Sequence, residues 1–529
     1  MRRFHSYGPV DCERHFCVER KELVENCLNS LIDDPDKGGH YFTIWAPRQT
    51  GKTWLMEQVK KEIEKRYGEQ FIVGKMSMQG TILEQDDPVN DFLKWVSVLI
   101  RDTFNVTIDE PVGWQDWTGF FHKTAGLFDR PVILFIDEFD SLPPQVIDLL
   151  VTLFRDMYLK RDAYQLHGLA MIGVRAVLGV ESQRGSPFNI QRSLYVPNFT
   201  KEEVNDLFQQ YIAESGQQVT SEVIDTVYES TKGQPGLVCW FGELLTEKYN
   251  PGKEKPVDMY VWREVHNKAL RLEWNNTVLN LVKKARMKYT SQVLQLFGKE
   301  DILFNTREDW CSYLYMNGII DSDTAYDEKG DPVEICRFSS PFVQQTLYSA
   351  LTGDLVGDKM PILPLEILDE LDDVFTENSL NLPALLRRYR DFLKRLKAKG
   401  INPFKEQPLR ADLRITEAVG HFHLYAWIQA VLGRRCVVSP EFPTGNGKVD
   451  LHLRCGNLRG IVEVKSFVDM AAYKRSMVQA AEYAKSLHFD SVTIAIFVPT
   501  DDESILNQLT VTKTIEGVTI NMEPIGWNV

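Results

Sequence analysis

The sequence predicts an α/β protein of several domains, and three observations lead to this fold class. Apolar, strand-like runs alternate with helical stretches over residues 41–175, a pattern typical of a parallel sheet covered on both faces. Residues 405–529 contain a second order of helix, hairpin, helix and apolar strand. The chain has 529 residues, too many for one hydrophobic core, so we expect three or four domains.

The elements of the first region follow one another in a clear order. A short opening segment and a helix occupy residues 1–40. Strands are then expected in 41–47, 71–78, 131–143 and 168–175, with a helix over 53–66 after the first of them. Beyond residue 199 the chain becomes helical, and Thr200 with Glu203 three residues later forms a capping box at the first of these helices.

The composition is that of a globular protein. Apolar residues make up 43% of the chain and charged residues 25%, which are ordinary proportions. No stretch approaches the roughly 18 apolar residues that span a bilayer, and the N-terminus lacks the apolar region of a secretory signal. We therefore expect a cytoplasmic protein with no membrane contact. The eight cysteines are scattered without a C-x-x-C motif, so we expect reduced thiols.

Charge limits the kinds of partner. The formal net charge of −14 argues against broad adhesion to DNA or to anionic lipid. A local basic stripe can still bind nucleic acid on an acidic molecule. Residues 386–400 form such a stripe, and its expected interpretation is a solvated helix face.

One loop has the pattern of a phosphate-binding loop. APRQTGKT fits G-x-x-x-x-G-K-[ST] at all but its first position, between a predicted strand and a predicted helix. Phosphates need exposed backbone N–H groups that lead into a helix N-terminus. We expect Gly51 to allow close approach, Lys52 to reach the β- and γ-phosphates of ATP, and Thr53 to bind Mg²⁺. The loop residues are Ala46, Pro47, Arg48, Gln49, Thr50, Gly51, Lys52 and Thr53.

Two acids follow the strand PVILFI. Asp137 and Glu138 are expected at the carboxyl edge of the sheet, where ligands of open α/β sheets bind. Asp137 is placed to hold Mg²⁺ and Glu138 to orient the attacking water. With these motifs, residues 41–245 resemble the AAA+/STAND group of P-loop ATPases. Gly233 and Pro235 resemble the G-x-P element of the helical lid in that group, where the proline lies near the nucleotide base, and 290–350 resembles its winged-helix module.

The resemblance implies a polar sensor and an arginine finger that acts on a neighbouring subunit, hence a homo-oligomer. Arg175 ends a predicted strand, and Arg184 and Arg192 follow in the next loop. An arginine finger stabilises charge in the transition state of phosphoryl transfer. The sequence does not distinguish among the three arginines, and each is also compatible with a surface or structural position.

A second site is predicted in the hairpin of residues 448–465. With Gly456 and Asn457 as a two-residue turn, Asp450 falls directly opposite Glu463. Opposed side chains lie about 4.5–5.5 Å apart at Cβ, and like charges there repel. Lys465 shares the face of Glu463. The opposite face is apolar, so the carboxylate pair indicates a divalent-metal site with a lysine beside it.

The spacing of Asp450, Glu463 and Lys465 resembles the D…(E/D)-x-K signature of the PD-(D/E)XK nuclease superfamily over residues 410–500. This resemblance implies that Asp450 and Glu463 bind Mg²⁺, with Mn²⁺ as an alternative, together with a backbone carbonyl. It implies that Lys465 positions or deprotonates the attacking water and that Glu417 orders a second metal or water. Gln479 and Tyr483 match the Q-x-x-x-Y element of several branches. His452 shares the face of Asp450, and a packed or surface histidine is its expected role.

Three function classes therefore stay open, the last of which is a nucleic-acid-binding protein whose two sites are both inactive. The first is an ATP-dependent metal nuclease of DNA, and the layout resembles proteins of antiphage defence or mobile elements. The second is a nucleotide-gated regulatory switch that binds nucleic acid or a protein partner through an inactive nuclease-like domain. The expected domains are a P-loop ATPase core (1–199), a helical lid (200–250), a winged-helix-like region (257–350), a helical connector (355–404) and an αβββαβ restriction-endonuclease-like domain (405–529).

Overall fold

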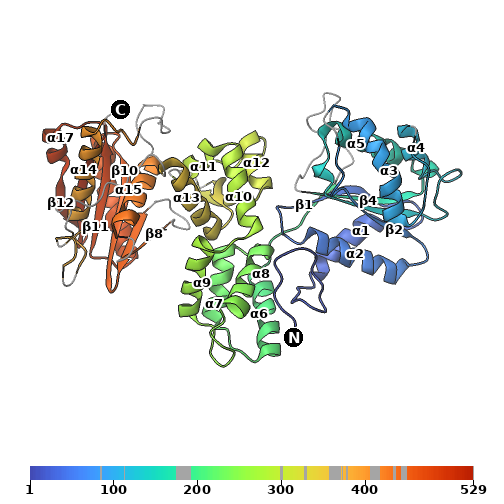
Figure 1. Cartoon of the computed structure of the whole chain (residues 1–529), viewed down its shortest axis with the longest axis horizontal. Coiled ribbons are helices and arrows are strands. Elements are labelled where there is room, and N and C mark those ends of the chain that lie inside the picture. The colour runs from blue at the N-terminus through green and yellow to red at the C-terminus, as the bar shows by residue number, and fades with distance from the viewer. Residues whose placement is uncertain are drawn as a thin grey trace. The chain divides into compact units, whose positions relative to one another are not determined.

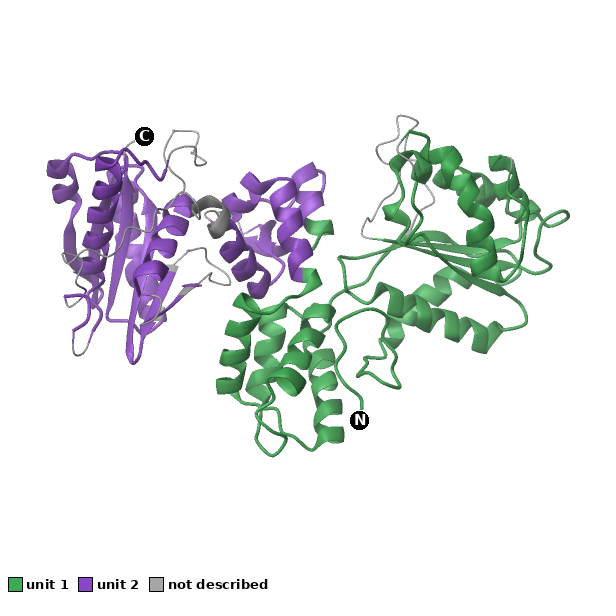
Figure 2. Cartoon of the chain, viewed as in Figure 1, with its two compact units in different colours: residues 1–277, 315–318 green, residues 278–314, 319–529 purple. Residues whose placement is uncertain are grey.

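The computed structural model divides into two compact units (Figure 2), residues 1–277 with 315–318 and residues 278–314 with 319–529. No helix in the described part of the chain combines the length and the apolar character that a bilayer crossing requires. The structure describes all residues except 84–85, 112, 174–191, 298–301, 327–330, 357–370, 372, 377–378, 405–416, 433–435, 442–449 and 528–529.

The first unit contains a five-stranded parallel sheet with the order β2-β3-β4-β1-β5. Strand β4 therefore lies between β1 and β3, the two strands that lead into the predicted nucleotide site. The parallel sheet confirms the predicted α/β class, while β5 was not expected. The strands are β1 (Tyr41–Trp45), β2 (Ile72–Ser77), β3 (Val132–Asp137), β4 (Leu166–Gly173) and β5 (Arg192–Tyr195).

Helices cover both faces of this sheet (Figure 1). Because side chains alternate along a strand, Ile133 and Phe135 pack with α1 and α2, whereas Leu134 and Ile136 pack with α3, α4 and α5. All four residues are fully buried. This two-sided burial is why the strands read as unbroken apolar runs. The helices are α1 (Lys21–Ile32), α2 (Lys52–Tyr67), α3 (Pro88–Phe104), α4 (Trp114–Gly119) and α5 (Pro144–Leu159), with short 3₁₀ turns η1 (Phe139–Ser141) and η2 (Arg161–Ala163).

A helical region follows the sheet within the first unit. Its first helix has the predicted capping box: the Thr200 hydroxyl accepts from the Glu203 N–H at 3.2 Å, and the Glu203 carboxylate accepts from the Thr200 N–H at 2.9 Å. The N-terminal segment packs against this region, with the Phe4 ring 5.0 Å from that of Phe208. The helices are α6 (Lys201–Ser215), α7 (Ser221–Thr231), α8 (Pro235–Glu243), a π-helical turn η3 (Leu244–Lys248) and α9 (Met259–Arg271).

The second unit begins with helices that lead into an antiparallel hairpin. We expected a strand within LYMNGIID, but residues 314–316 end α12, a turn follows, and the strand starts only at Ile320. The elements are α10 (Asn276–Met287), α11 (Thr290–Leu296), α12 (Asp309–Met316), β6 (Ile320–Tyr326), β7 (Pro332–Phe338) and α13 (Pro341–Val356).

A six-stranded mixed sheet forms the C-terminal part, with the order β12-β13-β11-β10-β9-β8. Strands β8, β9 and β10 are antiparallel, and β10, β11 and β13 are parallel. The run α15, β8, β9, β10, α16, β11 follows the predicted αβββαβ order. The elements are α14 (Leu382–Ala398), α15 (Glu417–Leu432), β8 (Val437–Glu441), β9 (Asp450–Cys455), β10 (Leu458–Ser466), α16 (Met470–Ser486), β11 (Ser491–Val498), α17 (Glu503–Leu509), β12 (Val511–Ile515) and β13 (Val518–Gly526).

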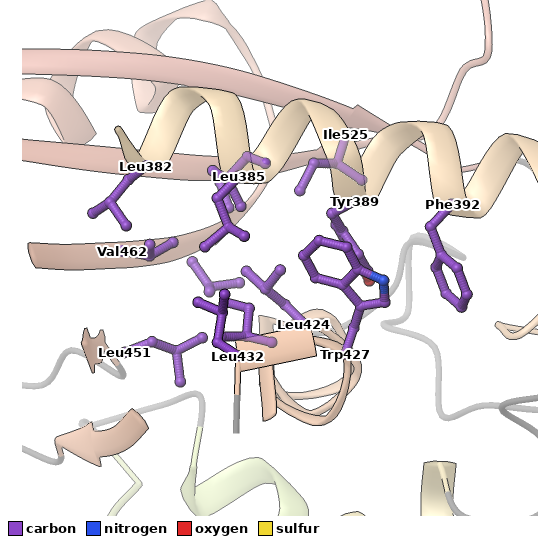
Figure 3. Packing of buried hydrophobic residues seen from close by; sticks show 14 of the residues in the cluster. Leu382, Leu385, Tyr389, Phe392, Leu424, Trp427, Leu432, Leu451, Val462 and Ile525 are labelled. Carbon is purple, nitrogen blue, oxygen red and sulfur yellow. The ribbon is translucent and has the colours of Figure 1, made fainter. Parts of the chain in front are cut away.

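Helix α14 is part of the core of this C-terminal fold. Its Leu385 and Tyr389 are fully buried and belong to one apolar cluster with Trp427 and Val462 (Figure 3). The sequence places this helix in a connector, yet its apolar side chains recur at helical spacing and cover the sheet. The expected connector therefore supplies a structural helix to the C-terminal fold.

The sequence predicts a solvated face for the basic stripe of α14, but in the structure its basic side chains form ion pairs. Arg390 and Lys394 pair with Glu503 at 3.0 and 2.6 Å, and Lys397 pairs with Asp501. The Lys394 ammonium, which bonds Glu503, holds the pKa of that carboxyl below its usual value. These ion pairs hold α14 against the start of α17. The acids lie far along the chain from α14, so the local sequence gives no sign of the pairing.

Four cysteines are paired, which contradicts the expectation of reduced thiols throughout. Disulfides join Cys12 to Cys17 and Cys436 to Cys455. Cys436 directly precedes β8 and Cys455 ends β9, and the antiparallel pairing of these strands places the two residues opposite one another. Sequence spacing alone does not reveal that Cys436 and Cys455 are neighbours, because the pairing of β8 with β9 brings them together.

Candidate functional site

The loop between β1 and α2 has the backbone of a phosphate-binding loop. Gly51, at a φ of +93°, precedes the first residue of α2, and Gln49 has a φ of +57°. The Thr50 hydroxyl closes the turn by donating to the Pro47 carbonyl at 2.9 Å. Ala46 is not among the residues with positive φ, so the alanine that replaces the usual first glycine causes no backbone strain.

Lys52 points back over this loop. Its ammonium donates to the carbonyl oxygens of Ala46 and Pro47 at 2.8 and 2.7 Å. Desolvation lowers the pKa of Lys52 to about 8, against the opposing effect of nearby carboxylates, with Asp140 first among them. A cation at the base of the loop is placed for phosphate recognition.

Asp137 ends β3, and its carboxylate faces the start of α2. The Thr53 hydroxyl donates to this carboxylate at 3.3 Å. Two oxygen donors at this position are the kind of ligands that Mg²⁺ prefers. The structure thus brings together the loop and the acid that the sequence predicted, from segments about eighty residues apart.

Glu138 follows in the left-handed region with a φ of +55° and lies exposed at the edge of the sheet. Partial desolvation raises its pKa, and the neighbouring charges of Asp137 and Asp140 add to the effect. Asp140 was not predicted. It packs against the end of β4, since a Cβ atom added at Gly173 would lie 2.4 Å from its carboxylate. The sequence signal that could have identified Asp140 is its position as an acid three residues after Asp137.

The turn before α8 contacts the phosphate loop directly. Gly233 has a φ of +69°, and a Cβ atom there would lie 1.9 Å from the Phe199 carbonyl, so glycine is required. Pro235 is the first residue of α8. The Gly236 N–H donates to the Gln49 carbonyl at 3.0 Å, and the Gln234 amide donates to the Arg48 carbonyl at 3.0 Å. We had not singled out Gln234.

The three candidate arginines are not placed by the structure. Arg175 and Arg184 lie outside the described residues. Arg192 begins β5, and its side chain also lies outside the described part of the structure. The sensor and finger roles therefore remain predictions.

The C-terminal hairpin has the predicted register. Cys455 pairs with Leu458, Leu453 with Gly460, and Asp450 with Glu463. The backbone of Asp450 is therefore directly opposite that of Glu463, while the Asp450 side chain lies outside the described residues.

Glu417, Glu463 and Lys465 come together. Glu463 is buried, with only 1% of its side chain exposed, and its carboxylate lies 3.2 Å from the Lys465 ammonium. Glu417, the first residue of α15, approaches the same ammonium at 4.0 Å and accepts from the Ser466 N–H at 3.4 Å. The structure thus brings together residues of two predicted segments, but it places Lys465 near both Glu417 and Glu463, whereas the sequence predicted a metal between Asp450 and Glu463 with the lysine beside it. Ser466, which aligns Glu417, was not predicted.

The remaining predicted residues have other surroundings. Gln479 lies exposed on α16, and within the described residues no hydrogen bond or ion pair joins it to Glu417, Glu463 or Lys465. Tyr483 is partly buried one turn further on.

His452 packs edge-on to Phe489, and burial lowers its pKa to about 4, so it is neutral at pH 7. Among the described side chains, no three acids, histidines or cysteines cluster as a metal site.

Comparison with known proteins supports the reading of the first unit. Residues 5–249 match the family model of the AAA-like domain. This match and the loop geometry together define an N-terminal P-loop ATPase domain. No curated protein matches the chain.

Several solved structures are similar to part of this chain. A Walker-type ATPase of Pyrococcus abyssi is 15% identical, covers 65% of this chain and 99% of its own, and has a TM-score of 0.45. The Aeropyrum pernix ORC1 protein in complex with DNA is 12% identical over 64% of this chain and 93% of its own, at 0.32. The RuvB Holliday-junction branch-migration motor of Thermotoga maritima is 14% identical over 59% and 91%, at 0.31.

Proposed function

We propose that the protein is an ATP-dependent metal nuclease. The AAA-like domain binds and hydrolyses ATP, and the C-terminal αβββαβ domain cleaves phosphodiester bonds in DNA. The observation that carries the nuclease part is the grouping of Glu417, Glu463 and Lys465, with Asp450 in register opposite Glu463. Buried carboxylates are costly unless a cation pairs with them or is coordinated by them. A site that holds a divalent cation and a phosphate explains their concentration here.

At the nucleotide site, the N–H groups at the start of α2 and the ammonium of Lys52 bind the phosphates. Thr53 and Asp137 supply oxygen atoms that fit Mg²⁺, which neutralises phosphate charge when it is bound. Glu138 orients the attacking water, and its raised pKa makes it a stronger proton acceptor than an ordinary glutamate.

At the nuclease site, Asp450 and Glu463 would hold Mg²⁺ or Mn²⁺ together with the backbone carbonyl of Val464, and the bound cation would supply Lewis acidity at the scissile phosphate. Lys465 positions the attacking water and offsets the negative charge that develops on the phosphate. Glu417 orients Lys465, and its approach to the same ammonium as Glu463 supports this role.

The proposal includes two kinds of partner. DNA is the substrate, with the C-terminal domain as its binding surface. A homo-oligomer of this chain completes the ATPase site, because an arginine finger acts across a subunit boundary.

The test incubates the purified full chain with plasmid and linear DNA, with and without ATP, and with Mg²⁺ or Mn²⁺. We expect cleavage that requires a divalent cation and responds to ATP. Lys465→Ala should lower cleavage by at least about 100-fold, the usual scale for loss of a group that assists proton transfer, and Asp450→Ala, which removes a ligand of the divalent cation, should also strongly reduce cleavage. Lys474→Ala, at an exposed position of α16, serves as the matched control and should cleave normally.

Phosphate release is measured in the same samples. It should be lost in Lys52→Ala and Glu138→Gln and retained in Asp450→Ala. Cleavage that survives both Asp450→Ala and Lys465→Ala would overturn the nuclease assignment. Nucleotide turnover without any cleavage would instead favour the regulatory switch, in which the C-terminal domain binds a partner without cutting it.

A further inference from the structure

Gln49, in the phosphate loop, is bonded to two other segments of the first unit. Its carbonyl accepts from the Gly236 N–H at 3.0 Å and from the Gln234 amide at 3.3 Å. Its side-chain oxygen accepts from the hydroxyl of Thr277. One residue of the loop thus links the start of α8 with the end of the first unit.

The contact with α8 is close and directional. A Cβ atom added at Gly236 would lie 2.6 Å from the side-chain oxygen of Gln49, so only glycine permits this approach. Gln234 also caps α8, because its side-chain oxygen accepts from the Leu237 N–H at 2.6 Å. Gln234 therefore bonds the loop through its amide group and the helix through its oxygen. A shift of the Arg48–Gln49 backbone has to move the first turn of α8 or break these bonds.

The contact with Thr277 lies where the chain leaves the first unit. The first unit extends to Thr277, and α10 runs on from Asn276 into the second unit. Thr277 and Asn275 are both buried, and the Asn275 side chain accepts from the Thr277 N–H at 2.9 Å, which fixes the start of α10. One of the places where the chain passes from the first unit to the second is therefore a helix whose opening turn is bonded to the phosphate loop.

We propose that Gln49, Gln234 and Thr277 form a nucleotide-sensing latch that transmits the state of the phosphate loop to the second unit. Lys52 donates to the Ala46 and Pro47 carbonyls in this structure. Nucleotide phosphates compete for the same ammonium and form stronger, charge-assisted bonds with it. The released carbonyls lie two and three residues before Gln49, so the bonds of Gln49 differ between the nucleotide-bound and nucleotide-free states. That difference is what allows a ligand to shift a conformational equilibrium.

The latch rests on the proposed function in one respect: the second unit carries the candidate nuclease site, so the latch is the means by which ATP would regulate cleavage. The test uses the full chain without nucleic acid. Hydrogen exchange of the backbone amides in the first turns of α10 is compared with no nucleotide, with ADP–Mg²⁺ and with ATP–Mg²⁺. We expect nucleotide to change this exchange in the unaltered protein.

Thr277→Val removes the hydroxyl and keeps the shape of the side chain. We expect this variant to bind and hydrolyse ATP normally while the nucleotide-dependent change in α10 is lost. The control is Thr226→Val, which removes a hydroxyl that bonds only within the helical region, to the Glu222 carbonyl and the Met259 sulfur. It should retain the change.

Gln234→Glu gives a second, independent test. The carboxylate still accepts from the Leu237 N–H, so α8 stays capped, but it cannot donate to the carbonyls of Arg48 and Gln49. We expect the change in α10 to be reduced or lost here too.

The latch is overturned if nucleotide leaves α10 exchange unchanged in the unaltered protein, or if the change persists in Thr277→Val. An absence of cleavage would remove the proposed nuclease function without touching the latch, since the exchange is measured without DNA. Unchanged exchange in α10 would remove the latch and leave cleavage as a separate question.

Discussion

Lys52 shows how a single residue depends on its surroundings. The motif places it in the loop, but its protonation is set by the fold, since desolvation by burial lowers its pKa to about 8. Two carbonyl acceptors hold the ammonium while the nearby carboxylates oppose the shift. The residue is thus poised to lose its proton within a biochemically accessible pH range.

This leads to a prediction about nucleotide affinity. Below about pH 8 Lys52 is charged in the free protein, so its charge makes no pH-dependent contribution to binding. Above that pH, binding has to take up a proton, and the Kd for ATP should rise by up to about tenfold per pH unit. Titrations at pH 7, 8 and 9 measure this. In Lys52→Arg, which stays charged, the rise should disappear, and an equal rise there would contradict the assignment to Lys52.

The cluster of Glu417, Glu463 and Lys465 illustrates what residue-scale reasoning could reach. The two-residue turn at Gly456 and Asn457 fixes the register, and the register fixes which residues oppose each other. The approach of Glu417 could be guessed only from a resemblance, because α15 joins the cluster through packing. Asp140 and Gln234 were missed because their roles depend on contacts with β4 and the phosphate loop.

At the scale of elements, α14 has the clearest consequences. It carries an apolar face buried in the core of the C-terminal domain and a basic face paired with acids near α17. Taken alone, its sequence predicts a helix in a connector with a basic, solvated face. The buried face decides its role, because burial of large apolar side chains contributes far more than exposed ion pairs.

Two substitutions on α14 separate these contributions. Leu385→Ala should destabilise the C-terminal domain by about 2–5 kcal/mol, the usual cost of truncating a buried leucine. Lys394→Ala, on the exposed face of the same helix, should cost less than about 1 kcal/mol. Urea unfolding of the full chain measures both. Equal midpoints for the two variants would mean that α14 does not belong to this core.

At the scale of the whole molecule, the chain consists of two compact units. The AAA-like domain and the helices that follow it lie in the first, and the hairpin and the mixed sheet lie in the second. A ligand stabilises the unit that binds it by RT ln(1 + c/Kd), where c is the free ligand concentration, so the stabilisation grows with the logarithm of that concentration. The division into two units should therefore be visible in thermal unfolding, because a ligand of one unit raises the Tm of that unit alone.

We expect two unfolding transitions in calorimetry. ATP–Mg²⁺ should raise the Tm of the transition that belongs to the first unit and leave the other nearly unchanged, apart from any contribution of the latch. Lys52→Ala should remove the increase. A single transition that shifts as a whole would show instead that the two units unfold as one cooperative body.

The sequence by itself determined the parallel sheet, the phosphate loop with Asp137 and Glu138, and the register of Asp450 with Glu463. These features rest on local patterns: apolar runs, glycine positions and the period of two along a strand. Only the tertiary structure decided that α14 is a core helix, that Cys436 pairs with Cys455, and that Gln49 contacts Gln234 and Thr277. Such contacts join residues far apart along the chain, and no local pattern specifies which distant surfaces will pack together.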